Sequence, residues 1–238
     1  MVITKDIQIG EVILMEYNTN LSAFKAYLMP VIIMIVLGLL LFLTAGSLRY
    51  WQAWIYWTIF SVLTLFITAY FSKRSPELLA RRWQHKDQET VRKTPGFLNF
   101  FTLFYFVAGF DFRFHWSTVP VWVVVAANLM VFLGYVFIII VFRENSYTSG
   151  NLTVEEEQPV ITTGPYAIIR HPMYAGMLLM VLFAPLALGS YWAVIPCLLF
   201  IPWLVIRIKS EEDLLLRELP GYSDYCMKTP YRLIPSIW

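Results

Sequence analysis

Long stretches without any charged side chain constrain this chain more than any other feature. Residues 28–45, 50–72 and 116–142 are each uncharged and mainly apolar. A helix of roughly 20 such residues crosses the hydrocarbon core of a bilayer, which is about 30 Å thick. Hydrophobic residues make up 58% of the chain, whereas a soluble domain has about 45–50%. We therefore predict an integral membrane protein.

Two further apolar stretches complete the predicted bundle. Residues 96–110 are uncharged but short for a span. Residues 172–206 would form one helix of roughly 50 Å, which is too long for a single crossing. Gly189 and Ser190 near their middle predict two short helices joined by a tight turn. The expected fold is all-α: a polytopic membrane bundle of about six spans that ends in a short helical hairpin, followed by an amphipathic helix and a tail.

The distribution of basic residues predicts the orientation of this bundle. Positive charge accumulates in cytoplasmic loops, and an inside N-terminus places 16 of the 18 Lys and Arg residues inside. Only Arg49 and Arg113 remain outside. The predicted inside segments are 1–26, 73–95, 143–171 and 207–238. We expect both termini on the cytoplasmic side, with the basic segment 73–95 contacting anionic lipid.

Polar residues gather in two segments that flank the last hairpin. Residues 143–171 precede it and residues 207–238 follow it, so both emerge at one face of the membrane and can converge there. We therefore divide the single membrane domain into residues 1–142, a leader with four spans, and residues 143–238, which contain the candidate site. The start of the chain lacks the features of a secretory signal peptide.

The first candidate group is Arg170-His171-Pro172. Proline is favoured in the first turn of a helix, so Pro172 is expected to begin the fifth span with His171 at its cap. The free N–H groups at such an end attract anions, and Arg170 adds a fork of donors suited to a carboxylate. The alternative is an interface anchor, in which Arg170 reaches the lipid headgroups.

The second candidate group is Glu211-Glu212. Adjacent acids on a helix point in different directions, so one is available for a ligand's ammonium or ribose hydroxyls while the other pairs with Arg207. The leucines that follow predict that the helix continues past these acids. The alternative is a solvated amphipathic helix with no ligand.

Other site classes find no support in the sequence. His85 and His115 fall on opposite sides of the membrane without a set of Cys or His partners, so no metal site is expected. Asp111 and Arg113 are expected to form an ion pair or an interface anchor. The net charge of +2 argues against nucleic-acid binding, and no glycine-rich nucleotide motif is present.

Together, these motifs resemble a known family. The run GPYAIIRHPMYAG, a short apolar hairpin, and then EEDLL, PGYSDY and YRLIP are similar to the isoprenylcysteine carboxyl methyltransferase family. That family shares an RHPxY…EE signature with membrane phospholipid methyltransferases. The resemblance covers about residues 143–238. SPELLARRW and GFDFRFHWS look like bacterial members, so a bacterial-type inner membrane is the expected location.

The resemblance implies an S-adenosyl-L-methionine-dependent methyltransferase without a Rossmann domain. The cofactor would lie at the cytoplasmic face, and a lipophilic substrate would enter from the bilayer. The chemistry of methyl transfer makes Arg170 and Arg207, which could hold a substrate carboxylate, and Glu212, which could accept a proton, the candidate catalytic residues. The residues implied in cofactor binding are Gln158, Tyr166, His171, Pro172, Tyr174, Gly176, Glu211, Glu212 and Tyr222.

The methyl acceptor is left open by the sequence. A carboxylate, such as an isoprenylcysteine or isoprenoid acid, needs no general base and could be held by Arg170 with Arg207 or Arg232. An amine, as in phospholipid N-methylation, must lose a proton, for which Glu212 is the candidate acceptor. The carboxylate is favoured. An NADPH-dependent sterol-type reductase and a non-enzymatic membrane scaffold are the remaining alternatives.

Overall fold

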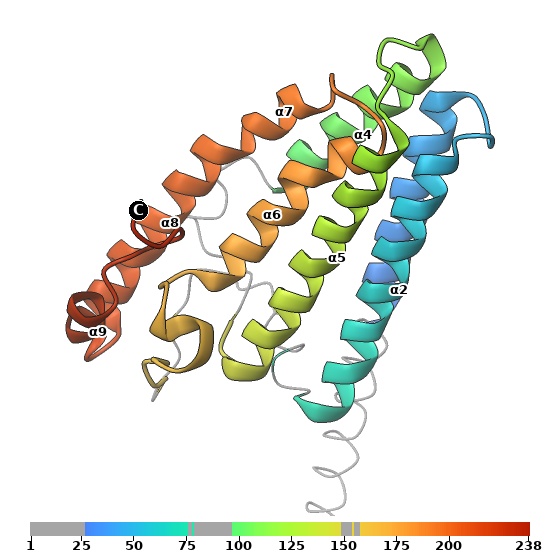
Figure 1. Cartoon of the computed structure of the whole chain (residues 1–238). Helices are drawn as coiled ribbons and strands as arrows, with labels where there is room; N and C mark the ends of the chain where they lie inside the picture. Colours follow the sequence, from blue (N-terminus) through green and yellow to red (C-terminus); the bar gives the residue numbers. More distant parts are fainter. Residues whose placement is uncertain (1–26, 76–77, 79–96, 149–153, 155–157) are drawn as a thin grey trace, which may run out of the picture.

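The computed structural model describes residues 27–75, 78, 97–148, 154 and 158–238, and within these ranges every regular element is helical (Figure 1). The elements are a first helix with the bounds Tyr27–Ala45, α2 (Trp51–Arg74), α4 (Phe97–Phe114), α5 (Val121–Glu144), the short 3₁₀ helix η2 (Gly164–Ala167), α6 (Pro172–Ala187), α7 (Val194–Leu198), α8 (Phe200–Glu218) and α9 (Tyr222–Lys228).

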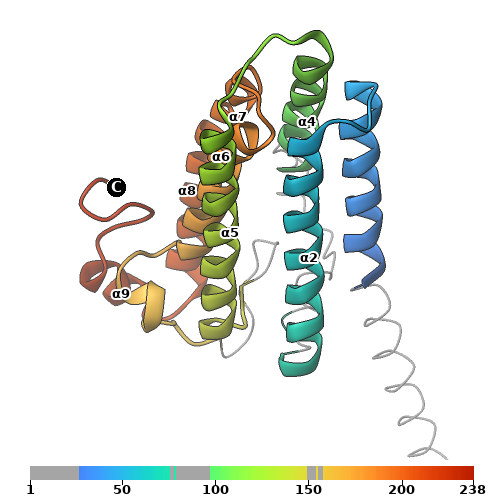
Figure 2. The same ribbon diagram turned by 45° about the vertical axis from the view of Figure 1, so that its right-hand side comes forward.

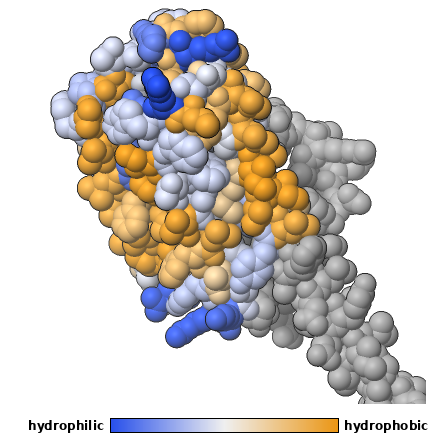
Figure 3. Space-filling model, turned by 90° about the vertical axis from the view of Figure 1, so that its right-hand side faces the viewer, coloured by the Kyte–Doolittle hydropathy of each residue, from blue (hydrophilic) through white to orange (hydrophobic). Residues whose placement is uncertain are grey.

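Three helices are long and apolar enough to cross a membrane. They are Tyr27–Ala45, α2 and α5, while α6 is a shorter apolar helix. The face formed by the first helix and α2 carries hydrophobic side chains in its middle and hydrophilic ones at its two ends (Figure 3). The predicted all-helical membrane fold is therefore confirmed. The number of six crossings and the cytoplasmic position of the tail stay predictions.

The last part of the chain forms the expected helical hairpin. Helix α6 ends at Ala187, and Gly189 adopts a left-handed φ of +74° in the turn, a conformation that glycine accepts without steric cost. Helices α7 and α8 lead back and meet at Leu199. Helix α8 continues through the two adjacent acids to Glu218, as the leucine pattern predicted.

Helices α5 and α6 lie side by side along most of their length (Figures 1 and 2). Gly134 and Gly176 make this close approach possible. A Cβ atom on Gly176 would lie only 2.7 Å from Cγ1 of Ile138 and 3.3 Å from the carbonyl oxygen of Gly134. This contact fixes the direction of α6 and therefore the position of the residues at its start.

The end of the bundle away from the start of α6 is held together by a buried carboxylate. Asp111 of α4 is fully buried, and its Oδ1 and Oδ2 accept hydrogen bonds from the backbone N–H and the hydroxyl of Ser117 at 2.7 and 2.6 Å. The hydroxyl of Ser190, in the α6–α7 turn, also donates to Oδ2. Asp111 thus ties the turn to the α4–α5 connection and does not form the expected ion pair with Arg113.

Candidate functional site

The segment before α6 pairs with the C-terminal tail. The backbone N–H of Arg170 donates to the carbonyl of Tyr231, and that of His171 to the carbonyl of Arg232, each at 2.9 Å. Pro172 then begins α6, as predicted from its missing N–H. The polar segments on either side of the hairpin therefore converge, although about 60 residues separate them in sequence.

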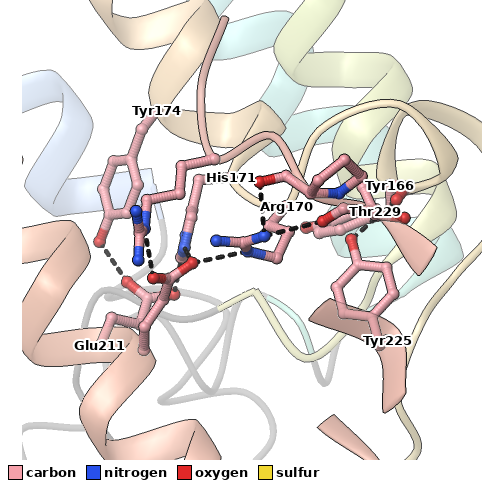
Figure 4. A network of polar contacts seen from close by, with 10 residues as sticks. Tyr166, Arg170, His171, Tyr174, Glu211, Tyr225 and Thr229 are labelled. Carbon is pink, nitrogen blue, oxygen red and sulfur yellow. Dashed lines mark hydrogen bonds and ion pairs between the residues drawn. The ribbon is translucent and has the colours of Figure 1, made fainter. Parts of the chain in front are cut away.

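Glu212 is the centre of the network that joins these segments. Figure 4 shows this network, with Arg170, His171 and Thr229 among the labelled residues. Its side chain is 6% exposed, and Oε1 accepts a hydrogen bond from Nε of Arg170 at 2.7 Å. Nε2 of His171 lies 3.3 Å from the same oxygen. Oε2 accepts a hydrogen bond from Nε of Arg232 at 2.5 Å. Helix α8, the start of α6 and the tail thus meet at one carboxylate.

These partners keep Glu212 ionised. Burial alone would raise the pKa of the carboxyl, but the hydrogen bonds from His171, Arg170 and Arg232 outweigh burial and lower the pKa from 4.5 to about 2. A carboxylate with this pKa is a poor proton acceptor near neutral pH. Its chemistry is that of a fixed negative charge.

Arg170 uses several of its donors within the protein. Besides the bond from Nε to Glu212, its Nη1 donates to the carbonyls of Thr229 and Pro230 at 2.8 and 2.9 Å. The side chain is 6% exposed. Arg170 therefore links α6, α8 and the tail, and it does not extend to the surface as an interface anchor would.

A second polar group surrounds the hydroxyl of Tyr174. This hydroxyl donates to Oε2 of Glu211 at 2.6 Å and accepts from Nε of Arg207 at 3.3 Å. Nδ1 of His171 lies 3.9 Å from Oε1 of Glu211. Glu211 and Glu212 thus point to different partners, as expected for adjacent residues on a helix.

A pocket opens beside these groups, with about 790 Å³ of free space that includes the adjoining solvent. Eight of the residues predicted from the sequence line it: Gln158, Tyr166, Arg170, His171, Pro172, Tyr174, Glu211 and Tyr222.

Three predicted residues lie outside this lining. Glu212 is behind it, bound to the arginines, and Arg207 contacts the hydroxyl of Tyr174. Gly176 faces α5, where it serves the helix contact. These placements divide the predicted set into residues that face the pocket and residues that position them.

The residues directly after α5 contribute to the pocket and were not predicted from the sequence. Asn145, Tyr147 and Thr148 follow the end of this helix and line the pocket wall. The hydroxyls of Thr148 and Tyr166 lie 3.2 Å apart. The run of polar residues directly after a span, on the same side as the RHP motif, was the signal that could have identified them.

The hydroxyl of Tyr222 is the feature of the pocket that most directly suits a ligand. Tyr222 is 4% exposed, and its buried hydroxyl has no hydrogen-bond partner in the described part of the chain. Burial and the charge of Glu212 raise its pKa, so it remains a protonated donor. An unpaired buried hydroxyl costs stability, and a polar ligand in the pocket would satisfy it.

Comparison with known proteins finds a family that is similar to part of the chain. Residues 122–221 match the model of the phospholipid methyltransferase family, so the match contains both α6 and the two acids of α8. The predicted resemblance is confirmed. Residues 122–221 are thus similar to a family of membrane methyltransferases, and they contain the RHPxY segment and the two adjacent acids, of which Glu211 lines the pocket.

Two individual proteins are similar to the chain. A nickel-cobalt-cadmium resistance protein, NccN, from Alcaligenes xylosoxydans xylosoxydans is 34% identical over 85 residues, which are 35% of this chain and 38% of that protein. The chain therefore matches well under half the length of this curated relative.

The second is a solved structure, the eukaryotic intramembrane Ras methyltransferase (isoprenylcysteine carboxyl methyltransferase). It has a TM-score of 0.55 and 19% identity, and the match covers 96% of this chain and 86% of that one. Because the two sequences are only 19% identical, the similarity shows a shared fold and nothing more.

Proposed function

We propose that this protein transfers a methyl group from S-adenosyl-L-methionine to a lipophilic acceptor in the membrane, most simply a carboxylate. The observation that carries this proposal is the convergence of the RHPxY segment and Glu211 on one pocket at the end of an apolar helix bundle, with Glu212 bound to Arg170 outside the lining. The proposed location of this end is the cytoplasmic side of an inner membrane.

The pocket residues fit the donor groups of this cofactor. The Glu211 carboxylate and the Tyr174 hydroxyl suit an ammonium or ribose hydroxyls, and the Tyr222 hydroxyl offers the unused donor described above. Leu214 and Leu215 supply an apolar wall. When bound, the cofactor supplies an electrophilic methyl group on a sulfonium, so the protein mainly needs to align the reactants and exclude water.

The low pKa of Glu212 supports a carboxylate as the methyl acceptor. A substrate carboxylate is already ionised at neutral pH and needs no base, whereas an amine must first lose a proton. With a pKa near 2 and three hydrogen-bonding neighbours, Glu212 is poorly suited to accept that proton. Arg207, whose Nε donates to the hydroxyl of Tyr174 at 3.3 Å, is our candidate for holding an acidic acceptor, because it contacts a residue of the pocket wall.

Phospholipid N-methylation is the second candidate. It is favoured by one observation, the match of residues 122–221 to the phospholipid methyltransferase family. In that reaction Glu211 would replace Glu212 as the group near the amine, because Glu211 lines the pocket and Glu212 does not.

Binding and methyl-transfer measurements on the purified full-length protein test the proposal. In detergent, S-adenosyl-L-methionine should bind at sub-millimolar concentration and NADPH should not, and Glu211→Gln should weaken the binding. Glu218→Gln is the matched control, because Glu218 is exposed on the same helix. Binding of NADPH alone would support the reductase alternative, and binding of neither would support a scaffold.

A radiolabelled methyl donor then identifies the acceptor class. Isoprenoid acids and prenylcysteine analogues should be labelled in a base-labile ester, whereas phosphatidylethanolamine should give a base-stable N-methyl product if the second candidate is correct. Absence of transfer to every lipid class, with the cofactor bound, would contradict both candidates.

A further inference from the structure

The end of the bundle opposite the pocket contains a groove that methyl transfer does not use. It lies between the first helix and α2 and is open to the outside, with about 1120 Å³ of free space that includes the adjoining surroundings. Its lining is apolar apart from one serine: Ile35, Gly38, Leu39, Phe42, Leu43, Gly46, Ser47, Leu48, Trp54 and Trp57.

Two indole rings give the groove a fixed shape. Nε1 of Trp57 donates to the carbonyl of Met34 at 3.0 Å, and Nε1 of Trp54 donates to the carbonyl of Leu48 at 2.9 Å. Gly38 makes room for one of these rings, since a Cβ atom there would lie 2.8 Å from Nε1 of Trp57. The groove is therefore shaped by one hydrogen bond between the two helices and one between α2 and the loop that joins them.

The length of the groove matches one leaflet of a bilayer. Ile35 and Ala45, the last residue of the first helix, are ten residues apart, which is about 15 Å along a helix. This is half of a hydrocarbon core of about 30 Å. Leu39 and Leu43 are 55% and 71% exposed on this stretch, so an acyl chain can reach them from the lipid.

An uncompensated positive charge lies at the end of the groove. The guanidinium Cζ of Arg113 is 3.6 Å from the position that a Cβ atom would take on Gly46, a lining residue. Arg113 is exposed, and no carboxylate lies within ion-pair distance of it in the described ranges. Asp111, the acid nearest in sequence, is occupied by Ser117 and Ser190.

We propose that this groove binds the acyl chain of an anionic phospholipid, with the phosphate of the headgroup at Arg113. The apolar lining, the length of one leaflet and the exposed cation of Arg113 at the interfacial end together fit this ligand. An arginine near an anionic membrane surface contributes roughly a fivefold preference for anionic over zwitterionic lipid.

Native mass spectrometry of the full-length protein tests this proposal. The protein is released from micelles that contain phosphatidylglycerol or phosphatidylcholine with identical acyl chains, and the lipid that remains bound is counted. Arg113→Gln should reduce the preference for phosphatidylglycerol several-fold, and Leu43→Trp, which fills the groove, should reduce retention of both lipids. The matched controls are Arg143→Gln at the end of α5 and Leu129→Trp on its exposed face, and both should behave as the wild type.

Three results would overturn the proposal. One is equal retention of the two lipids by the wild type, and another is an unchanged preference after Arg113→Gln. The third is a change from dimer to monomer after Leu43→Trp without any change in bound lipid, which would identify a second copy of the chain as the occupant. None of these results depends on methyl transfer, so the lipid-binding proposal and the proposed methyltransferase function are tested independently.

Discussion

Replacing Glu212 by glutamine probes the network that joins α6, α8 and the tail. The substitution keeps the shape of the side chain and removes its charge, so Arg170, at 6% side-chain exposure, is left without its counter-ion. The pKa of Glu212 falls from 4.5 to about 2 on folding, which corresponds to about 3 kcal/mol at 1.36 kcal/mol per unit. Breaking a buried ion pair from one side typically costs about 3–5 kcal/mol, in agreement.

The expected consequence is a large fall in thermal stability. For a chain of this size about 3 kcal/mol corresponds to a decrease in Tm of roughly 6–12 °C. The measurement is thermal unfolding of the purified protein in detergent at pH 7. Glu218→Gln, an exposed substitution on the same helix, should change the Tm little.

The pH dependence gives a second check with a defined sign. Because the folded pKa of Glu212 is below the unfolded value, its contribution is fully present above pH 4.5 and is lost as the pH falls toward 2. The difference in stability between wild type and Glu212→Gln should therefore shrink in this window. Equal Tm values at pH 7, or a difference that persists unchanged to pH 2.5, would refute the ion-pair argument.

Three further substitutions test other parts of the structure. Tyr222→Phe should weaken cofactor binding about fivefold without lowering the Tm, because it removes an unpaired buried hydroxyl; calorimetry measures both. Gly176→Ala should destabilise by about 1–3 kcal/mol in denaturant titration, since its Cβ would meet Ile138 at 2.7 Å. Asp111→Asn should cost about 1–3 kcal/mol in the same assay, because it replaces an acceptor oxygen facing Ser117 by a second donor.

The sequence predicted the local elements well because their signals are local. Pro172 marks the start of α6 and Gly189 its terminal turn, and both depend only on backbone chemistry at those positions. The apolar stretches likewise identify spans by length alone. What local signals could not predict was the partner of each polar group, such as Asp111 binding two serines instead of Arg113.

The same limit applies to the candidate site. The RHP motif and the adjacent acids were each visible, and a family resemblance joined them. Their geometry depends on the tail, whose carbonyls at Thr229 and Pro230 fix the Arg170 side chain. A contact between a side chain and a backbone carbonyl 60 residues away cannot be predicted from periodicity or spacing in the sequence.

The motif therefore contains two kinds of residue with different consequences for specificity. Glu212 and Gly176 hold the helices and tail together, His171 and Tyr174 face the pocket, and Arg170 does both. If the residues of the motif bind only the tail and the cofactor, they need not contact the methyl acceptor. The same motif can therefore occur in enzymes that methylate different acceptors. Selection of the acceptor then has to come from pocket residues outside the motif. The wall formed by the residues after α5 and by Val160 and Ile161 is the part of the pocket free to vary with the substrate.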